Sequence, residues 1–586
     1  MTALLPIPSK EILPKLPPSY PNFDSFIKGF SLGKIVTEKQ NPITLNLSAV
    51  AKKDLIEGLG LLLRVDEGVV QGFIEFSPLV AEISKELQEK MSQGGSVFFV
   101  GCGSSGRVAL DLAARSEDPR VIGVIAGGDS AFVKALEGFE DSSEKGAQAL
   151  KKYFIRANDT VFLISASGSA TFNVGSGHAA ANAGAKVYYF FNSKEVLDVT
   201  NESLDRTRAL FERKVNPVIP LCVDIGPQAI TGSTRLQAAS LAMGLGALFD
   251  PNENFSKKLN EANALIRTHL TDIAAFVKRE VEVLGSPTSN FRRCRDETNQ
   301  GYVTLVGSKR TIRPALVDTT EIPPTFSTNP PRERGQTTKL PEFAAYLFTS
   351  DEICNNVQAW ETLLGREAAP EFLENMKKYT LGIDVSEGDS FEKRPKGKGN
   401  FVFGVEILRV NERISKEWLE YLGKEDGMIV LCEGELHPDD RALLSDLHTI
   451  IYENVPQDRQ HMIETILLKQ TLNLISNGTM ILLNKVVGNL MVDVRASNLK
   501  LVNRCMRQIQ QIWNEPLDKK WLYYVVASMY EKKKVYDAMP NYSPSIVILV
   551  LAMLAMNKTP EDFEEIVAEL ATRKEDVETL LNRPIH

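Results

Sequence analysis

The chain has no long hydrophobic run and no surplus of basic residues. Its longest apolar run, Ile546–Met556, is shorter than the ~20 residues that a membrane-spanning helix needs. We therefore interpret it as a buried core helix that begins at Ser543-Pro544. The formal net charge of −8 provides no attractive field for nucleic acid or an anionic membrane surface. The one basic cluster, Phe391–Asn400, is typical of a solvated loop.

Metal-binding patterns and cysteine pairs are also missing. The six histidines are scattered without an H-x-H or H-E-x-x-H pattern, and the six cysteines form no C-x-x-C pair. Several cysteines lie in strand-like runs such as VIPLCVDIG, which favours buried, reduced thiols and a cytoplasmic protein. The N-terminus is polar and rich in proline, unlike a signal peptide. We expect no metal site and no cofactor.

Strand-like and helix-like runs alternate from Ser96 onward. A chain of 586 residues is too long for one hydrophobic core, and its length indicates two to four domains. The alternation predicts an α/β fold with a doubly wound parallel sheet, in which ligands bind where strands end and helices begin. The five predicted strands are SVFFVG, VIGVIAGG, TVFLISAS, AKVYYFFN and NPVIPLCVDIG.

A second alternation starts at Gly301–Arg310 and continues through NFVFGVEIL and GMIVLCEG. Its strand, glycine, short polar loop, arginine and helix repeat the order of the first half, so we predict an internal duplication. Residues 1–45 read as an extended arm, whereas residues 48–93, 231–284 and the part beyond about 460 read as helical. The predicted domains are an N-terminal arm with helices (1–95), a first α/β domain with intact loops (96–284), a second, degenerate one (285–490) and a helical lid (491–586).

The stretch VFFVGCGSSGRVAL has the G-x-G-x-x-G spacing of a dinucleotide loop. Such a loop calls for an acidic residue at the end of the second strand, but two glycines precede Asp129 there. Three hydroxyl-rich loops each link a strand to a helix, and helix N-termini bind anions. We therefore favour a cradle for one phosphate, formed by Ser104, Ser105, Ser167, Ser169, Thr231, Ser233 and Thr234.

Several motifs of the first half occur together: GCGSSGR, IAGGD, EGFEDS, SASGS and IGPQAITGSTRLQA. In that order they resemble the sugar isomerase (SIS) domain of N-acetylmuramic acid 6-phosphate etherases. The segments VTEKQNPITLNL and NKVVGNLMVDVRASNLKL resemble the flanking parts of that family. The layout in two halves resembles the glucokinase regulatory protein, which has two SIS domains and a helical lid and binds fructose phosphates without catalysis.

The etherase resemblance implies two catalytic glutamates and no metal. One acts as a base at C2 of an open-chain sugar phosphate, and the other as an acid on the lactate that leaves C3. The EGxED motif places one of them at Glu140, which could instead be an acid at the end of a surface helix. The family's D-x-x-E-C-P-P-T pattern has Arg115 at its acidic position in the first half, whereas VDTTEIPPTF in the second half supplies Glu321.

We therefore hypothesise that Glu321 crosses a pseudo-twofold axis to join Glu140 in one composite site. Lys485 matches a lysine that touches the phosphate in the regulatory relative. Three departures from the etherase pattern, Ser169, Gln228 and Gln237 in place of an arginine, a glutamate and a lysine, bear on substrate choice and turnover.

Three functions stay open at this point: a lyase on N-acetylmuramic acid 6-phosphate or a close amino-sugar phosphate, a non-catalytic sugar-phosphate sensor that regulates a protein partner, and an aldose–ketose isomerase. All three take a phosphorylated sugar, and none requires nucleic acid or a membrane. A partner surface within residues 330–400 would favour the sensor. Because both halves lie in one chain, the protein is predicted to be a pseudo-dimer, which is compatible with a monomer.

Overall fold

The structure is a computed structural model. It describes residues 13–572, except 30–31, 137, 252–253, 286–301, 327, 329–341, 348–355, 369–399, 416–418, 420–421, 425, 497, 514 and 537–543. The basic cluster 391–399, Glu137 of the EGFED motif and most of the 330–400 segment therefore lie outside the described residues.

The first half contains a parallel five-stranded sheet in the order β2-β1-β3-β4-β5. These strands are the five predicted from the sequence, and their order is the flavodoxin-like one. Every residue of β1 and β3 is buried, as expected for central strands of a sheet covered by helices on both faces. The strands are β1 (Val97–Gly101), β2 (Val121–Ile125), β3 (Thr160–Ile164), β4 (Lys186–Phe191) and β5 (Ile219–Cys222).

The second half repeats this topology. Its parallel sheet has the order β10-β9-β8-β6-β7, which is the same arrangement when its own strands are counted along the chain. The duplication and the tandem α/β fold are thereby confirmed. Two of its strands, β7 and β10, were not predicted, because their short sequences carry no clear alternation. The strands are β6 (Tyr302–Gly307), β7 (Glu342–Leu347), β8 (Asn400–Leu408), β9 (Gly427–Cys432) and β10 (His448–Tyr452).

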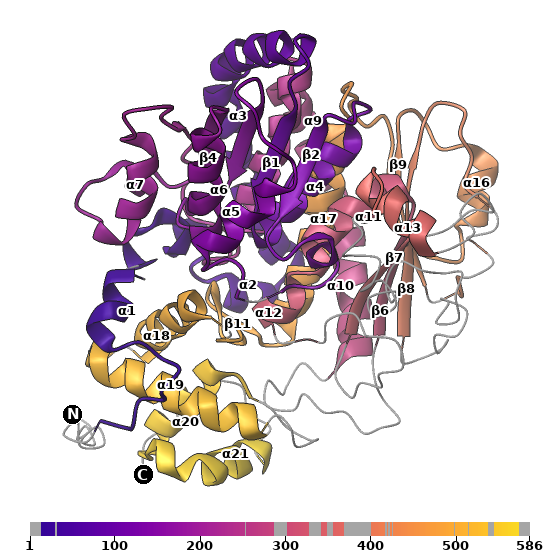
Figure 1. The fold of residues 1–586 in the computed structure, drawn as a ribbon. Coiled ribbons are helices and arrows are strands. Elements are labelled where there is room, and N and C mark those ends of the chain that lie inside the picture. The colour runs from indigo at the N-terminus through magenta and orange to yellow at the C-terminus, as the bar shows by residue number, and fades with distance from the viewer. Residues whose placement is uncertain are drawn as a thin grey trace.

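Helices from both halves fill the space between the two sheets (Figure 1). The helix that follows the first strand of each sheet, α4 (Gly103–Arg115) or α11 (Lys309–Thr319), packs against its counterpart. The long α17 (Met462–Leu482) lies against α11 and against α9 (Phe255–Thr268) and α10 (Leu270–Leu284). This packing brings the segment after α11 close to the carboxyl ends of the first sheet.

The regions outside the sheets differ in part from the predictions. Residues 47–92 are helical as predicted, in α2 (Leu47–Lys53) and α3 (Leu55–Ser92), but the arm is not extended throughout. It contains α1 (Phe23–Gly29), whose Phe26 ring stacks on Tyr523 with 4.2 Å between centroids. Burial of these aromatic rings stabilises the short helix. The sequence did not predict it, because the prolines nearby indicate an extended chain. Residues 231–236 form a loop before α8 (Gln237–Met243), and not the predicted helix start.

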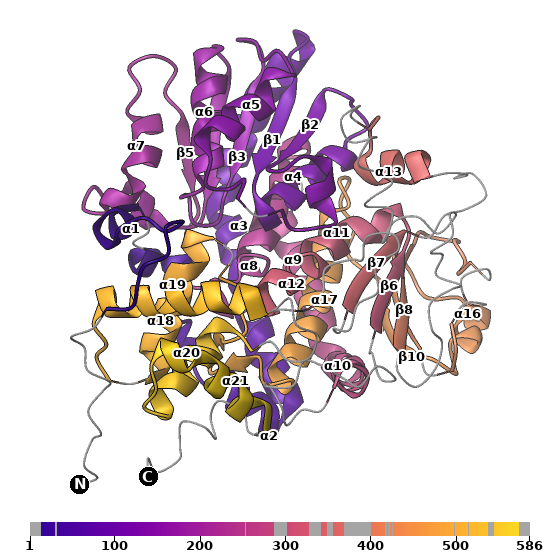
Figure 2. The same cartoon turned by 60° about the horizontal axis from the view of Figure 1, so that its bottom comes forward.

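The C-terminal helices form a bundle beside the first sheet (Figure 2). They are α18 (Leu499–Trp513), α19 (Lys519–Tyr536), α20 (Ile546–Ala555) and α21 (Phe563–Thr572), and a small hairpin of β11 (Val486–Val487) and β12 (Leu490–Met491) precedes them. All of Ile546–Leu554 is buried, so the predicted core helix is confirmed, with Ser545 as its N-cap. Within the described residues, no helix is long and apolar enough to cross a bilayer. The exact limits of the four predicted domains stay a prediction.

Candidate active site

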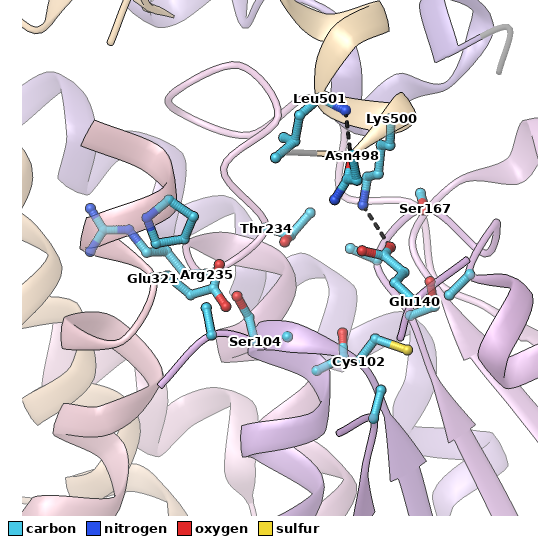
Figure 3. Close-up of a pocket in the computed structure, with 18 of the residues that line it drawn as sticks. Cys102, Ser104, Glu140, Ser167, Thr234, Arg235, Glu321, Asn498, Lys500 and Leu501 are labelled. Carbon is cyan, nitrogen blue, oxygen red and sulfur yellow. Dashed lines mark hydrogen bonds and ion pairs between the residues drawn. The ribbon is translucent and has the colours of Figure 1, made fainter. Parts of the chain in front are cut away.

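A cavity of about 130 Å³ lies where three separate parts of the chain meet (Figure 3). The first half contributes the loops that follow β1, β2 and β3 and the loop before α8. The second half contributes Glu321 and two residues of α12 (Ile322–Phe326), Pro324 and Thr325. The C-terminal part contributes residues around the start of α18. The cavity therefore sits at the carboxyl ends of the first sheet, as doubly wound folds predict.

The GCGSSG stretch is the turn from β1 into α4. Ser104 and Ser105 lie in the first turn of the helix, where backbone N–H groups have no partner within the helix. Ser104 is only 4% exposed, and its hydroxyl lines the cavity without a hydrogen-bond partner among the described residues. A methyl group built on Gly106 would lie 2.7 Å from the Gly101 carbonyl oxygen, so this close turn requires glycine. The turn thus presents donors to the cavity that are not used by the described protein itself.

The other two loops contribute only some of their predicted hydroxyls. Ser167 lines the cavity, and its Oγ is 2.8 Å from the Oγ of Ser169, which faces a smaller neighbouring cavity instead. Ser233 and Thr234 also line the main cavity, and the buried Ser233 hydroxyl has no partner within the described chain. Thr231 does not reach it, because its hydroxyl donates to Asn489 Oδ1 at 3.3 Å.

Glu140 lies in the segment between β2 and α5 (Ser143–Lys151) and lines the cavity. Its side chain is 29% exposed, and its Oε1 accepts a hydrogen bond of 2.9 Å from the Lys500 ammonium. Burial alone would raise the pKa of Glu140, but the Lys500 charge and hydrogen bond hold it below its ordinary value. Glu140 is therefore an ionised carboxylate at neutral pH.

Glu321 enters the same cavity from the second half. It follows α11, and its Oε1 accepts a hydrogen bond from the Arg107 guanidinium of α4. A methyl group built on Gly103 would lie 3.3 Å from Oε1 of Glu321, so the glycine leaves room for the carboxylate. Arg115, which takes the equivalent place in the first half, is bound to Asp111 at 2.8 Å. The structure thus brings Glu140 and Glu321 together in one cavity.

The predicted Lys485 does not line this cavity. Its ammonium donates to the Phe326 carbonyl at 2.8 Å and to Asp493 at 2.6 Å, so it holds the end of α12. Lys500 supplies an ammonium at the cavity instead, from the first turn of α18. Both lysines lie within the same C-terminal motif, NKVVGNLMVDVRASNLKL. They differ in position: Lys485 precedes the β11–β12 hairpin, whereas Lys500 lies in the first turn of α18 and lines the cavity.

Sequence reasoning also missed the arginines of the cavity wall, Arg107, Arg235 and Arg504. Each cation of the wall forms an ion pair with one carboxylate, and all four carboxylates lie far from their partners in the sequence. The four ion pairs are Arg107–Glu321, Arg235–Asp318, Lys500–Glu140 and Arg504–Glu38. Burial raises the pKa of Asp318, although Arg235 opposes this shift. The wall therefore combines balanced charges with neutral hydroxyl donors.

In the second half, side chains of the protein itself form ion pairs and hydrogen bonds at the corresponding positions. Arg310, which has the position of Ser104, forms an ion pair of 2.9 Å with Glu412. Asp458 accepts hydrogen bonds from the first N–H groups of α17, at 3.0 Å from Met462 and 2.8 Å from Ile463. A carboxylate of the protein itself thus occupies the helix N-terminus that could otherwise bind an anion.

The fold and the cavity define a class: two flavodoxin-like domains in tandem that share one polar cavity at their interface. A family model described as the glucokinase regulatory protein N-terminal SIS domain matches residues 79–180. An N-acetylmuramic acid 6-phosphate etherase of Halalkalibacterium halodurans is 31% identical over 268 residues, which are 42% of this chain and 84% of the relative. The etherase of Salinibacter ruber is 31% identical over 39% of this chain and 68% of its own length.

The chain therefore belongs to the family of N-acetylmuramic acid 6-phosphate etherases. Among solved structures, a tagatose-6-phosphate ketose/aldose isomerase from Escherichia coli is similar with a TM-score of 0.41 and 10% identity, covering 72% of this chain and 94% of that one. The C-terminal domain of a glucosamine-fructose-6-phosphate aminotransferase from Francisella tularensis gives 0.39 and 10%, with coverage of 74% and 96%.

Proposed function

We propose that this protein is a lyase that cleaves the lactyl ether of N-acetylmuramic acid 6-phosphate or a close amino-sugar phosphate. The observation that carries the proposal is the composite cavity, in which Glu321 of the second half joins Glu140 and the serine loops of the first. The family membership and the names of the etherase relatives support the same reaction.

The phosphate is assigned to the donors that have no partner within the described protein. The buried Ser104 and Ser233 hydroxyls and the free N–H groups at the start of α4 can surround a phosphate without adding charge. Lys500 is close enough to the cavity to contribute a cation. The sugar would then extend between Glu140 and Glu321.

The two carboxylates are assigned by their surroundings. Glu140 is held ionised by Lys500 and therefore suits the base that takes the proton from C2, next to the C1 aldehyde. We assign Glu321 to the other side of the reaction, where in its protonated form it donates a proton to the lactate oxygen as the C3–O bond breaks. Because its carboxylate is paired with Arg107, Glu321 has to take up this proton when the substrate binds. The electrons of the C2–H bond become the C2=C3 double bond. Water then adds to this bond: Glu321 takes a proton from the water as its oxygen bonds to C3, and Glu140 returns its proton to C2. No step requires a metal.

The test is lactate release from N-acetylmuramic acid 6-phosphate by the purified protein. We expect Glu140→Gln and Glu321→Gln each to lower the rate by about 10²–10⁴-fold, the usual contribution of an acid or base. Glu144→Gln is the matched control, because Glu144 is exposed on α5 and bonds only to the side chain of Gln148 among its described contacts. Wild-type protein that binds the sugar phosphate but releases no lactate would refute the proposal.

A sensor is the second candidate, and the match to the glucokinase regulatory protein model favours it. In a sensor, the charge-balanced cavity would bind a sugar phosphate and transmit this to a protein partner. Glu321→Gln separates the two functions, because it abolishes lactate release from a lyase but leaves the affinity of a sensor for sugar phosphate nearly intact. We place either activity in the cytoplasm, which fits the free thiols of Cys102, Cys222, Cys432 and Cys505.

A further inference from the structure

A single buried carboxylate joins the N-terminal arm to α18. Glu38 is 1% exposed, although it lies in a segment that precedes both domains. Its Oε1 accepts a hydrogen bond of 2.5 Å from Arg504 Nη2, and its Oε2 accepts one of 3.1 Å from Arg504 Nε. Arg507 Nη1 lies 3.5 Å from Oε2 and its Nη2 donates to the Glu38 carbonyl. Glu38 therefore binds two arginines one turn apart on the same helix.

The segment around Glu38 and the Arg504 side chain also contact the loop before α8, which carries Ser233. The Gly232 N–H donates to the Thr37 carbonyl at 3.0 Å. A methyl group built on Gly232 would lie 2.6 Å from Arg504 Nε, so the guanidinium packs directly on the loop backbone. The arm, the loop that carries Ser233 and the helix that carries Lys500 thus form one unit at the edge of the cavity.

The charges of this unit act on Glu140. Lys500 and Arg504 are four residues apart, so they lie on one face of α18, and both line the cavity. Lys500 is paired with Glu140, whereas Arg504 is paired with Glu38. Both cations lower the pKa of Glu140, and Glu38 raises it. The charged or titratable groups that face Glu140 are Lys500, Arg504, Glu38, Asp141, Arg206 and Cys102.

We propose that Glu38 is a positioning residue of this site: it holds α18 over the cavity and offsets the charge of Arg504. Lys500 is then the main cavity-lining cation of α18 that acts on Glu140 and on the phosphate. This inference rests on the proposed function for the identity of the base, but not for the binding of phosphate. Glu38 acts through Arg504 and does not touch the cavity itself.

The test compares Glu38→Gln with Glu195→Gln. Glu195 is the matched control, because it also holds the arm, at Val36 N and at Lys39, but lies outside the cavity. The probes are inorganic phosphate and N-acetylglucosamine 6-phosphate, with binding measured by calorimetry. We expect Glu38→Gln to bind both about tenfold more tightly, because one unmatched positive charge remains near the anion. The acid limb of the pH–rate profile for lactate release should move to lower pH, because Glu38 raises the pKa of Glu140 and its charge is removed. Glu195→Gln should change neither.

A second comparison covers the case in which Glu38→Gln does not fold. Arg504→Gln leaves Glu38 with only the more distant Arg507 as its partner, so more of its negative charge acts on the cavity and phosphate should bind more weakly. Adding Glu38→Gln to it should restore affinity by about tenfold. Equal affinities of Arg504→Gln and the double variant, or weaker binding by Glu38→Gln without a shift in the pH profile, would overturn the inference. Binding requires no turnover, so a wild type that releases no lactate refutes the proposed lyase while the affinities still decide the role of Glu38.

Discussion

Ser104→Ala should separate ligand binding from stability. The Ser104 hydroxyl is buried, lines the cavity and has no hydrogen-bond partner among the described residues. The hydroxyl makes no hydrogen bond to the described protein, so its removal breaks none. Its removal should therefore leave the free energy of unfolding of the ligand-free protein unchanged or higher, while a bound phosphate loses one donor.

The magnitude follows from the charge of the ligand. A hydrogen bond to a charged group contributes about 1.5–3 kcal/mol, so the affinity for phosphate should fall about 10- to 100-fold. Ser105, beside it, is only partly buried and also lines the cavity. Ser105→Ala should weaken binding in the same range if its hydroxyl contacts the phosphate.

The matched control is Ser176→Ala, in α6 (Thr171–Asn182). Ser176 is fully buried like Ser104, but its hydroxyl donates to the Gly146 carbonyl at 3.0 Å and lies away from the cavity. Its loss breaks a buried hydrogen bond, which costs about 0.5–1.5 kcal/mol. Ser176→Ala should therefore melt earlier and still bind phosphate like wild type.

Both quantities are measurable on the same samples, by calorimetric titration with N-acetylglucosamine 6-phosphate and by thermal unfolding without ligand. The two variants should have opposite effects. Ser104→Ala should lose affinity for the sugar phosphate and keep its stability, whereas Ser176→Ala should lose stability and keep its affinity. A Ser104→Ala protein that binds normally but unfolds at lower temperature would show that the hydroxyl is structural and that the phosphate lies elsewhere.

Two further predictions concern pH. Lys500→Met removes the cation paired with Glu140, so the pKa of Glu140 should rise. The acid limb of the pH–rate profile for lactate release should then move to higher pH. A limb that does not move would mean that Glu140 is not the base. Burial raises the pKa of Glu280 to about 8, far above that of an exposed glutamate, so the folded state holds a proton that the unfolded state has released. Stability should fall as pH rises from about 5 to about 8 and level off above that. Glu280→Gln should reduce this fall by about 3 kcal/mol in denaturant titrations, and equal slopes for both proteins would contradict the buried proton.

The sequence predicted those features that depend on local patterns. Continuous apolar runs marked the five strands of the first sheet, because a central parallel strand is buried on both faces. The repeated order of strand, loop and helix predicted the second sheet, although β7 and β10 were missed. The complementary loss of motifs, with Arg115 in one half and Glu321 in the other, predicts a composite cavity to which both halves contribute.

What the sequence determined was therefore the duplication, the α/β topology and the small set of loops that could carry the chemistry. The tertiary structure decided which of those side chains meet. Thr231 turns to Asn489 while Ser233 faces the cavity, and Lys500 takes the place expected for Lys485. It also decided that Glu38, Asp318 and Glu321 each neutralise an arginine far away in the chain. The direction of a side chain in an irregular loop depends on distant segments packed against it, and a buried charge is stable only where one of them supplies its partner.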